Sequence, residues 1–83
     1  MEKEVVVTLE DGINADVVSL LVQTACRFDS RLYLQEGERK VNMKSIMGMM
    51  NMAVNSGKAV TVIADGADAA EAVSQIEKVL TGK

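Results

Sequence analysis

Few residues in this chain could carry out chemistry, and the residue types that it lacks exclude several kinds of site. The chain contains no histidine, the side chain most often used to move protons near neutral pH and the commonest nitrogen ligand of zinc. Cys26 is the only cysteine, so no disulfide can form within the chain, and a lone thiol suits a reducing cytoplasm. We therefore expect no metal, no cofactor and no enzyme activity.

Two segments place a polar side chain at the expected start of a helix. Asn14 is a natural N-cap, and Asp16 would lie in the first turn, where the positive end of the helix dipole favours a carboxylate. Ser45 is expected to cap a second helix. A phosphate on Ser45 would meet free backbone N–H groups there, so phosphorylation would add charge without unfolding the domain. An amide is not a useful phosphoryl acceptor, so Asn14 offers no such chemistry.

The length and charge of the chain limit its partners. Eighty-three residues suffice for one core, so we expect a single domain over 1–83 whose function lies on its surface. Nine basic against twelve acidic residues give a net charge of -3, which argues against direct binding to nucleic acid. No apolar stretch approaches the ~20 residues of a membrane span, and the apolar run near the first residues is too short for us to expect a secretory leader. We expect a cytoplasmic protein that does not bind membranes.

These residues must be positioned by seven elements. Period-two alternation predicts strands over 5–10 and 59–64 and a hairpin over 31–42 that turns at Glu36-Gly37. Helical spacing predicts a first helix with apolar residues from Val18 to Phe28, a short helix over 46–53 and a last helix that starts at Asp68. The order β-α-β-β-α-β-α predicts a two-layer α+β domain.

Several side chains receive a structural interpretation. Asp68 and Glu71 are spaced as a capping box for the last helix. Its buried stripe is predicted to contain Ala69, Val73, Ile76 and Leu80. Cys26 flanks the apolar stripe of the first helix and is interpreted as a small packing residue. Tyr33 is out of register with its apolar neighbours, so it should lie on the open face of the sheet.

Methionine is concentrated in one segment. Five of the six methionines stand at positions 43, 47, 49, 50 and 52. A short helix cannot bury all of them against one sheet, so some must be exposed, where a flexible and polarisable side chain suits a surface that accommodates protein partners. About half of the cluster must nevertheless belong to the core, either Met49 with Met52 or Ile46 with Met50.

Four motifs together resemble the HPr family, the histidine-containing phosphocarriers of the bacterial sugar phosphotransferase system. They are Gly12-Ile13, Leu21-Val22-Gln23-Thr24-Ala25, Lys44-Ser45-Ile46-Met47-Gly48 and Asp65-Gly66-Ala67-Asp68. The resemblance covers nearly the whole chain. It implies an open-faced sandwich, in which a four-stranded antiparallel sheet is covered on one face by three helices.

The chain departs from this family at the reactive position. Where the family motif reads Gly-Ile-His-Ala-Arg-Pro, this chain has Asn14, Asp16 and Val17 in place of the phosphorylated histidine, the phosphate-binding arginine and the proline. The carboxylate of Asp16 would repel phosphate where a guanidinium would bind it. We therefore expect no phosphate transfer through position 14, and poor transfer even after an Asn14→His reversion.

The regulatory serine of the family, in contrast, is matched by Ser45. The resemblance implies phosphorylation by the HPr kinase/phosphorylase, a role in carbon catabolite control with a catabolite-control transcription factor, and contact with phosphotransferase components. The catabolite-repression HPr proteins (Crh) likewise lack the histidine and keep the serine, although they retain the Ala-Arg-Pro that is Ala15-Asp16-Val17 here. The partner-binding residues implied by the family are Asp16, Ser19, Gln23, Ile46, Met47 and Met50.

Other interpretations stay open at this point. Ser45 can simply cap its helix, in which case the domain is a constitutive binding module or a decoy for the partners of a true phosphocarrier. The chain can also be a divergent phosphocarrier that uses another residue. The sequence leaves the oligomeric state open between a monomer and a weak homodimer formed through exposed strand edges.

Overall fold

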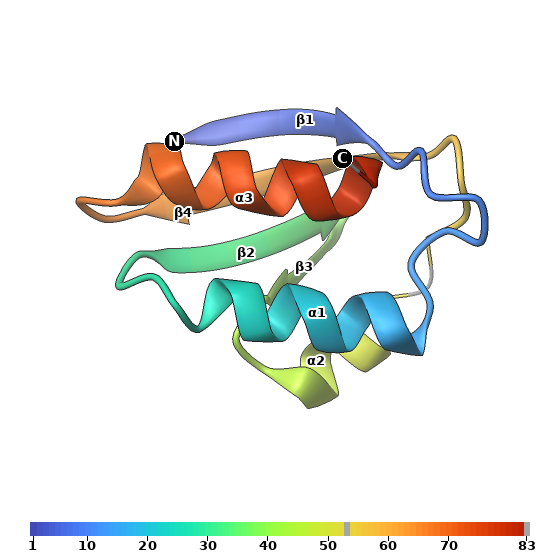
Figure 1. Ribbon diagram of the computed structural model, residues 1–83, viewed down its shortest axis with the longest axis horizontal. Helices are drawn as coiled ribbons and strands as arrows, with labels where there is room; N and C mark the ends of the chain where they lie inside the picture. The colour runs from blue at the N-terminus through green and yellow to red at the C-terminus, as the bar shows by residue number, and fades with distance from the viewer. Residues whose placement is uncertain (53, 83) are drawn as a thin grey trace.

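A computed structural model describes residues 1–52 and 54–82 (Figure 1). The elements follow the predicted order: β1 (Glu2–Val6), α1 (Ala15–Ala25), β2 (Arg31–Glu36), β3 (Arg39–Asn42), α2 (Ile46–Met50), β4 (Ala59–Asp65) and α3 (Ala69–Thr81). The predicted second helix ends earlier than expected, at Met50, and its predicted last residue, Ala53, lies outside the described residues.

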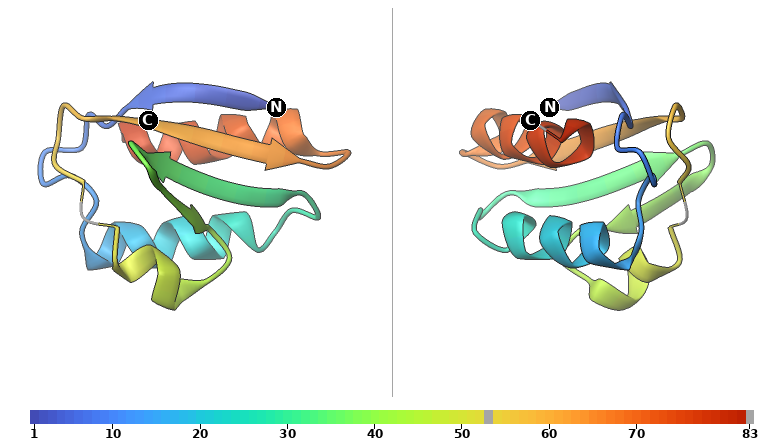
Figure 2. Two further views of the ribbon diagram at one scale, coloured as in Figure 1. Left: turned by 180° about the vertical axis from the view of Figure 1, so that it is seen from behind. Right: turned by 45° about the vertical axis from the view of Figure 1, so that its right-hand side comes forward.

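The four strands form one antiparallel sheet in the order β1-β4-β2-β3. Helices α1 and α3 lie side by side over one face, and α2 packs beside α1 and against β3 (Figure 1). Within the described residues, no helix covers the opposite face of the sheet, as the view from behind shows (Figure 2). The predicted two-layer α+β sandwich with one covered face is confirmed.

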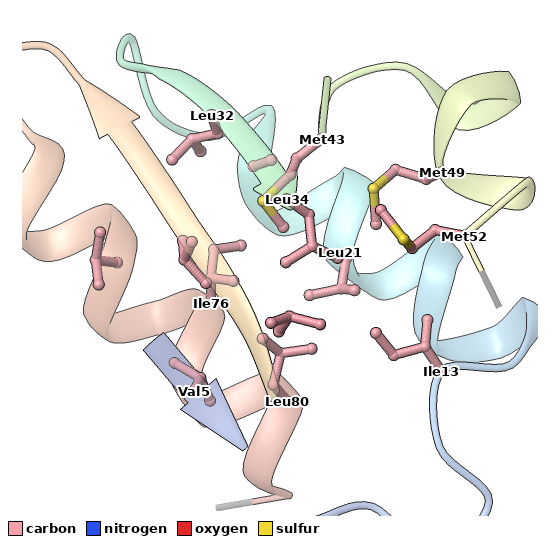
Figure 3. Packing of buried hydrophobic residues seen from close by; sticks show 14 of the residues in the cluster. Val5, Ile13, Leu21, Leu32, Leu34, Met43, Met49, Met52, Ile76 and Leu80 are labelled. Carbon is pink, nitrogen blue, oxygen red and sulfur yellow. The ribbon is translucent and has the colours of Figure 1, made fainter. Parts of the chain in front are cut away.

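The core lies between the sheet and the helices. Alternate residues of the central strands, such as Leu32 and Leu34 in β2, are buried against Leu21 of α1 and Ile76 of α3 (Figure 3). All four residues of the predicted α3 stripe are buried. Tyr33 points to the open face, where the ammonium of Lys40 lies 4.7 Å from the centre of its ring.

The first strand begins and ends earlier than its alternation predicts. It was expected over 5–10, whereas β1 covers Glu2–Val6 and pairs with β4 as far as Ala59. Beyond Val6, the segment that precedes β4 turns away from β1. The backbone of Val7 forms hydrogen bonds with Gly57 and Lys58 in that turn. The charged start of the strand is accommodated because Lys3 forms an ion pair of 2.7 Å with Glu77 of α3.

The packing role predicted for Cys26 is wrong, because the side chain is exposed. Helix α1 ends at Ala25, and Cys26 is its C-cap. Since successive helical residues are rotated by about 100°, the buried stripe through Leu21 and Ala25 leaves the next side chain pointing away from the sheet.

The capping box predicted for α3 is also wrong. Asp68 stands at the N-cap position, but its side chain forms no hydrogen bond with the first turn of α3. The carboxylate instead accepts from the backbone N–H groups of Asp29 and Ser30, at 2.9 and 3.0 Å, and from the Ser30 hydroxyl. It therefore joins the start of α3 to the loop that follows α1.

Candidate functional site

The position of Asn14 is fixed by the loop that precedes α1. The backbone N–H of Ile13 donates to the carbonyl oxygen of Val54 at 2.8 Å, in an isolated antiparallel bridge between two distant segments. Gly12 makes this approach possible, because its φ of +67° favours glycine and a Cβ there would overlap the same carbonyl oxygen. The start of α1 is thus held by tertiary contacts before the helix begins.

Asn14 is the N-cap of α1, as the sequence predicts. Its Oδ1 accepts a hydrogen bond of 3.0 Å from the backbone N–H of Val17, and its carbonyl oxygen accepts from Val18. Asp16 is exposed in the first turn, as expected, and it is the acidic residue of that turn. The amide oxygen of Asn14 therefore caps the helix, and the charged side chain nearest to it in the first turn is the carboxylate of Asp16.

A second set of contacts positions Ser45. The Lys44 ammonium donates to the carbonyl oxygen of Phe28, just past α1, at 2.7 Å, and the Ser45 backbone N–H donates to the carbonyl oxygen of Asn42 at 3.1 Å. Lys44 contacts the region just past the end of α1, and Val54 pairs with Ile13 just before its beginning. The segment from Lys44 to Val54 therefore runs back along α1. Asn14 and Ser45 therefore lie toward opposite ends of the α1–α2 pair.

The predicted capping role of Ser45 is confirmed. Its Oγ accepts from the backbone N–H of Gly48 at 3.3 Å, and the side chain is exposed to solvent. The first turn of α2 contains no acidic residue. A negative group on Ser45 would therefore meet unopposed helix N–H groups, in contrast to the first turn of α1.

The residues expected to bind partners lie on two helices that pack together. On α1, Asp16 and Gln23 are exposed, and Gln23 Nε2 donates to Ser19 Oγ at 3.2 Å, so these side chains share one face. On α2, three large apolar side chains project into solvent: Ile46, Met47 and Met50. We call the exposed side chains of these two helices the α1–α2 face. Whether it binds a partner stays a prediction.

The sequence interpretation missed one member of this face. Leu20 is 50% exposed although it is a large apolar residue in the middle of α1. The signal was present, because Leu20 lies outside the buried stripe of Val18, Leu21 and Ala25 and follows Asp16 by one helical turn.

The methionine segment divides between core and surface. Met43, Met49 and Met52 are buried, and Figure 3 shows them pointing inward toward Leu21 and Leu34. Of the two core pairs considered, Met49 with Met52 is the buried one, and Ile46 with Met50 is exposed. The short helix thus presents an apolar side to solvent as well as to the core.

Other kinds of site find little support in the described part of the chain. Residues 1–52 and 54–82 contain no cluster of three acidic, cysteine or histidine side chains that could hold a metal ion, and no pocket is present among them. Over the same residues, no helix has the length and apolar character needed to cross a membrane.

The pKa of Asp68 departs from its ordinary value. The hydrogen bond from the Ser30 hydroxyl, followed by that from the Asp29 backbone N–H, holds the pKa of this carboxyl below its usual range. Because Asp68 bonds to the loop after α1, at the end of that helix away from Asn14, it supports the site without belonging to it.

The family model described as "PTS HPr component phosphorylation site" matches residues 1–81. The chain belongs to the HPr family. It is 42% identical to the HPr-like protein Crh of Halalkalibacterium halodurans over 76 residues, which cover 92% of this chain and 90% of that protein.

Solved structures of the family agree with this assignment. The phosphocarrier protein HPr of Bacillus anthracis superposes with a TM-score of 0.91 at 35% identity, over 96% of this chain and 95% of that one. Crh of Bacillus subtilis, described as an intertwined dimer with a swapping domain, has a TM-score of 0.80 at 41% identity, over 98% and 93% of the two chains. The chain is thus an HPr-like protein related to both phosphocarriers and Crh proteins.

Proposed function

We propose that this HPr-like protein does not carry phosphate on a histidine and instead binds protein partners under the control of phosphorylation at Ser45. It would act as a single domain over 1–83, without a cofactor and without enzyme activity of its own. The observation that carries this proposal is the contrast between its two capping residues, since Asn14 offers an amide where Ser45 offers an exposed hydroxyl.

The environment of Asn14 argues against phosphate transfer there. The chain has no histidine, and the Asn14 amide oxygen is already bonded to the Val17 N–H. The exposed carboxylate of Asp16, two residues on, would repel an incoming phosphoryl group, whereas the arginine of the family motif would bind it.

The environment of Ser45 favours a phosphate. The hydroxyl is exposed, and its oxygen already lies 3.3 Å from the backbone nitrogen of Gly48, so phosphate oxygens on Ser45 would reach the same N–H group. The lack of an acidic residue in the first turn of α2 removes a source of repulsion. Phosphorylation would therefore add negative charge beside the α1–α2 face while leaving the fold intact.

The α1–α2 face supplies the proposed docking surface. Its apolar part consists of Ile46, Met47, Met50 and Leu20, and its polar part of Asp16, Ser19 and Gln23. Large exposed apolar side chains that gather on one face mark protein interaction sites in soluble proteins. A phosphate on neighbouring Ser45 would change which partners this surface accepts.

The proposed partners follow from the family. They are the HPr kinase/phosphorylase, a catabolite-control transcription factor and phosphotransferase components, and the proposed location of this chain is the cytoplasm. The 42% identity to a Crh protein supports carbon catabolite control as the setting. Direct contact with nucleic acid or membrane is not part of the proposal.

We propose a monomer or weak homodimer as the oligomeric state. Strand β1 lies at the edge of the sheet and pairs with β4 alone, so its other edge is free to pair within the described residues. The swapped dimer described for Crh of Bacillus subtilis supports this possibility.

Incubation with HPr kinase/phosphorylase and ATP, followed by intact mass measurement, tests the switch. The unmodified chain should gain one phosphate, and Ser45→Ala should gain none. No mass gain in the unmodified chain would leave a constitutive binding module or decoy. A gain that survives in Ser45→Ala would place the phosphate elsewhere and would contradict the proposal.

A further inference from the structure

The methionines of segment 43–52 differ sharply in their access to solvent. Met43 and Met49 are 0% exposed and Met52 is 1% exposed, with their side chains inside the core (Figure 3). Met47 is 80% exposed and Met50 is 63% exposed. The five-residue helix α2 directs Met49 inward and these two methionines outward, so a single turn of helix carries thioethers of both kinds.

Exposed thioethers are open to oxygen transfer from a peroxide. A sulfur lone pair attacks one oxygen of hydrogen peroxide, the S–O bond forms, the O–O bond breaks and water leaves. Sulfur is oxidised and the peroxide is reduced, and the flexible apolar side chain becomes a polar sulfoxide. A thiol-dependent sulfoxide reductase reverses the step, since the oxygen leaves as water while two thiols become a disulfide.

We propose that Met47 and Met50 form a reversible oxidation site that makes the apolar part of the α1–α2 face more polar without disturbing the core. The core is spared because neither side chain belongs to the buried cluster. The entry to α2 is also spared, because it is held by the Ser45 cap and by the Lys44 contact with Phe28, and these bonds involve no thioether.

Oxidation would act on the same surface as the proposed docking. A sulfoxide oxygen accepts hydrogen bonds from water, and these are lost when an apolar partner covers it. Each sulfoxide on Met47 or Met50 should therefore weaken partner binding by about tenfold. This consequence rests on the proposed function, whereas the oxidation site itself does not.

Peroxide mapping tests the site directly. The full chain with Cys26→Ser, which removes the exposed thiol as a competing target, is treated with hydrogen peroxide under native conditions and analysed by peptide mass. Met47 and Met50 should oxidise at least about tenfold faster than Met49. Equal rates, or a thermal midpoint that falls as these two sulfoxides accumulate, would overturn the proposal.

Hydrophobic-interaction chromatography measures the change in surface polarity. The oxidised folded chain should elute earlier than the untreated chain, and sulfoxide reductase should restore the original elution. A double variant, Met47→Leu with Met50→Leu in the Cys26→Ser chain, keeps the face apolar, so its elution should shift by no more than the small contribution of the exposed Met1. Met49→Leu is the matched core control, and it should keep the full response. A shift in the double variant as large as that of the parent chain would assign the effect to another residue, such as Met1, which is 59% exposed, and would contradict the proposal.

Phosphorylation by HPr kinase/phosphorylase tests the consequence for docking. Oxidation should slow phosphorylation of Ser45 in the parent chain and leave the double variant unaffected. Equal rates before and after oxidation would refute the effect on docking. A chain that is never phosphorylated would count against the proposed function alone, because the mapping and elution experiments still decide the oxidation site.

Discussion

Helices α1 and α2 begin with the same kind of N-cap made by different side chains. Asn14 has a φ of -101° and accepts from the N–H three residues later at 3.0 Å, and Ser45 has a φ of -104° and accepts from the N–H three residues later at 3.3 Å. Beside the first cap stands the carboxylate of Asp16, whereas the second is preceded by the ammonium-bearing Lys44. Both caps have an extended backbone, with a ψ of -175° at Asn14 and 112° at Ser45, and the charged side chains beside them are of opposite sign.

The difference shows that the capping role does not determine whether the capping residue is chemically reactive. A cap needs only a short side chain with an oxygen acceptor, which both an amide and a hydroxyl provide. A family scaffold can therefore lose a reactive group at one helix start and keep a modifiable one at the other without a change of fold. Asp68 adds a third case, because it stands at a cap position and bonds to a different segment.

The largest effect is expected when the start of α1 is given a phosphate acceptor. We expect no label on the unmodified chain after incubation with enzyme I and labelled phosphoenolpyruvate, and weak label on Asn14→His. Adding Asp16→Arg should raise labelling by at least about tenfold, because hydrogen bonds to charged groups contribute about 1.5–3 kcal/mol. Label on the unmodified chain, or equal label on the single and double variants, would contradict the role assigned to Asp16.

Substitution of Gly12 tests how far the Asn14 cap depends on its tertiary support. Gly12→Ala should destabilise the fold by about 3 kcal/mol, because a Cβ would overlap the Val54 carbonyl oxygen and the backbone is left-handed. Gly37→Ala is the matched control, since Gly37 has a φ of +59° and no atom within 4 Å of a Cβ, and it should cost only about 1 kcal/mol. Urea unfolding measures both values, and equal costs would show that the contact with Val54 is unimportant.

Removing each cap compares the two helix starts directly. Asn14→Ala should cost about 1 kcal/mol and Ser45→Ala about 0.5 kcal/mol, because the second hydrogen bond is longer and starts a helix of five residues. Thermal and urea unfolding of the two variants provide the measurement. The reverse order of costs would mean that the shorter helix depends more on its cap than its geometry indicates.

The smallest effect on stability is expected for Asp68, at the start of α3, when the solution is made acidic. The folded chain holds the pKa of Asp68 below its ordinary value, so protonation favours the unfolded chain. The stabilisation is present above the unfolded carboxyl pKa of about 4 and is lost as the pH falls through the folded pKa.

Asp68→Asn should therefore lower the thermal midpoint at neutral pH, and the gap to the parent chain should narrow toward about pH 2. Asp65→Asn, which removes an exposed carboxylate at the end of β4, is the matched control. A constant gap across this range would show that the hydrogen bonds from Asp29 and Ser30 do not depend on the charge of Asp68.

The candidate site was largely accessible from local sequence patterns. Asn14 and Ser45 precede apolar helical stretches, so their capping roles could be predicted and are confirmed. The roles proposed for Ser45 in regulation and for the α1–α2 face in partner binding stay predictions. Leu20 was missed because it lies outside the apolar stripe of α1, which is the pattern that helical spacing marks.

The sequence by itself determined the order of the elements, their amphipathic sides and the two caps, because these depend on residue spacing within one or two turns of chain. Only the tertiary structure decided which methionines are buried, why Cys26 is exposed and where the Asp68 carboxylate bonds. Those outcomes depend on contacts between segments far apart in the chain, such as Ser30 and Asp68, which stand 38 positions apart, and no local pattern contains such contacts.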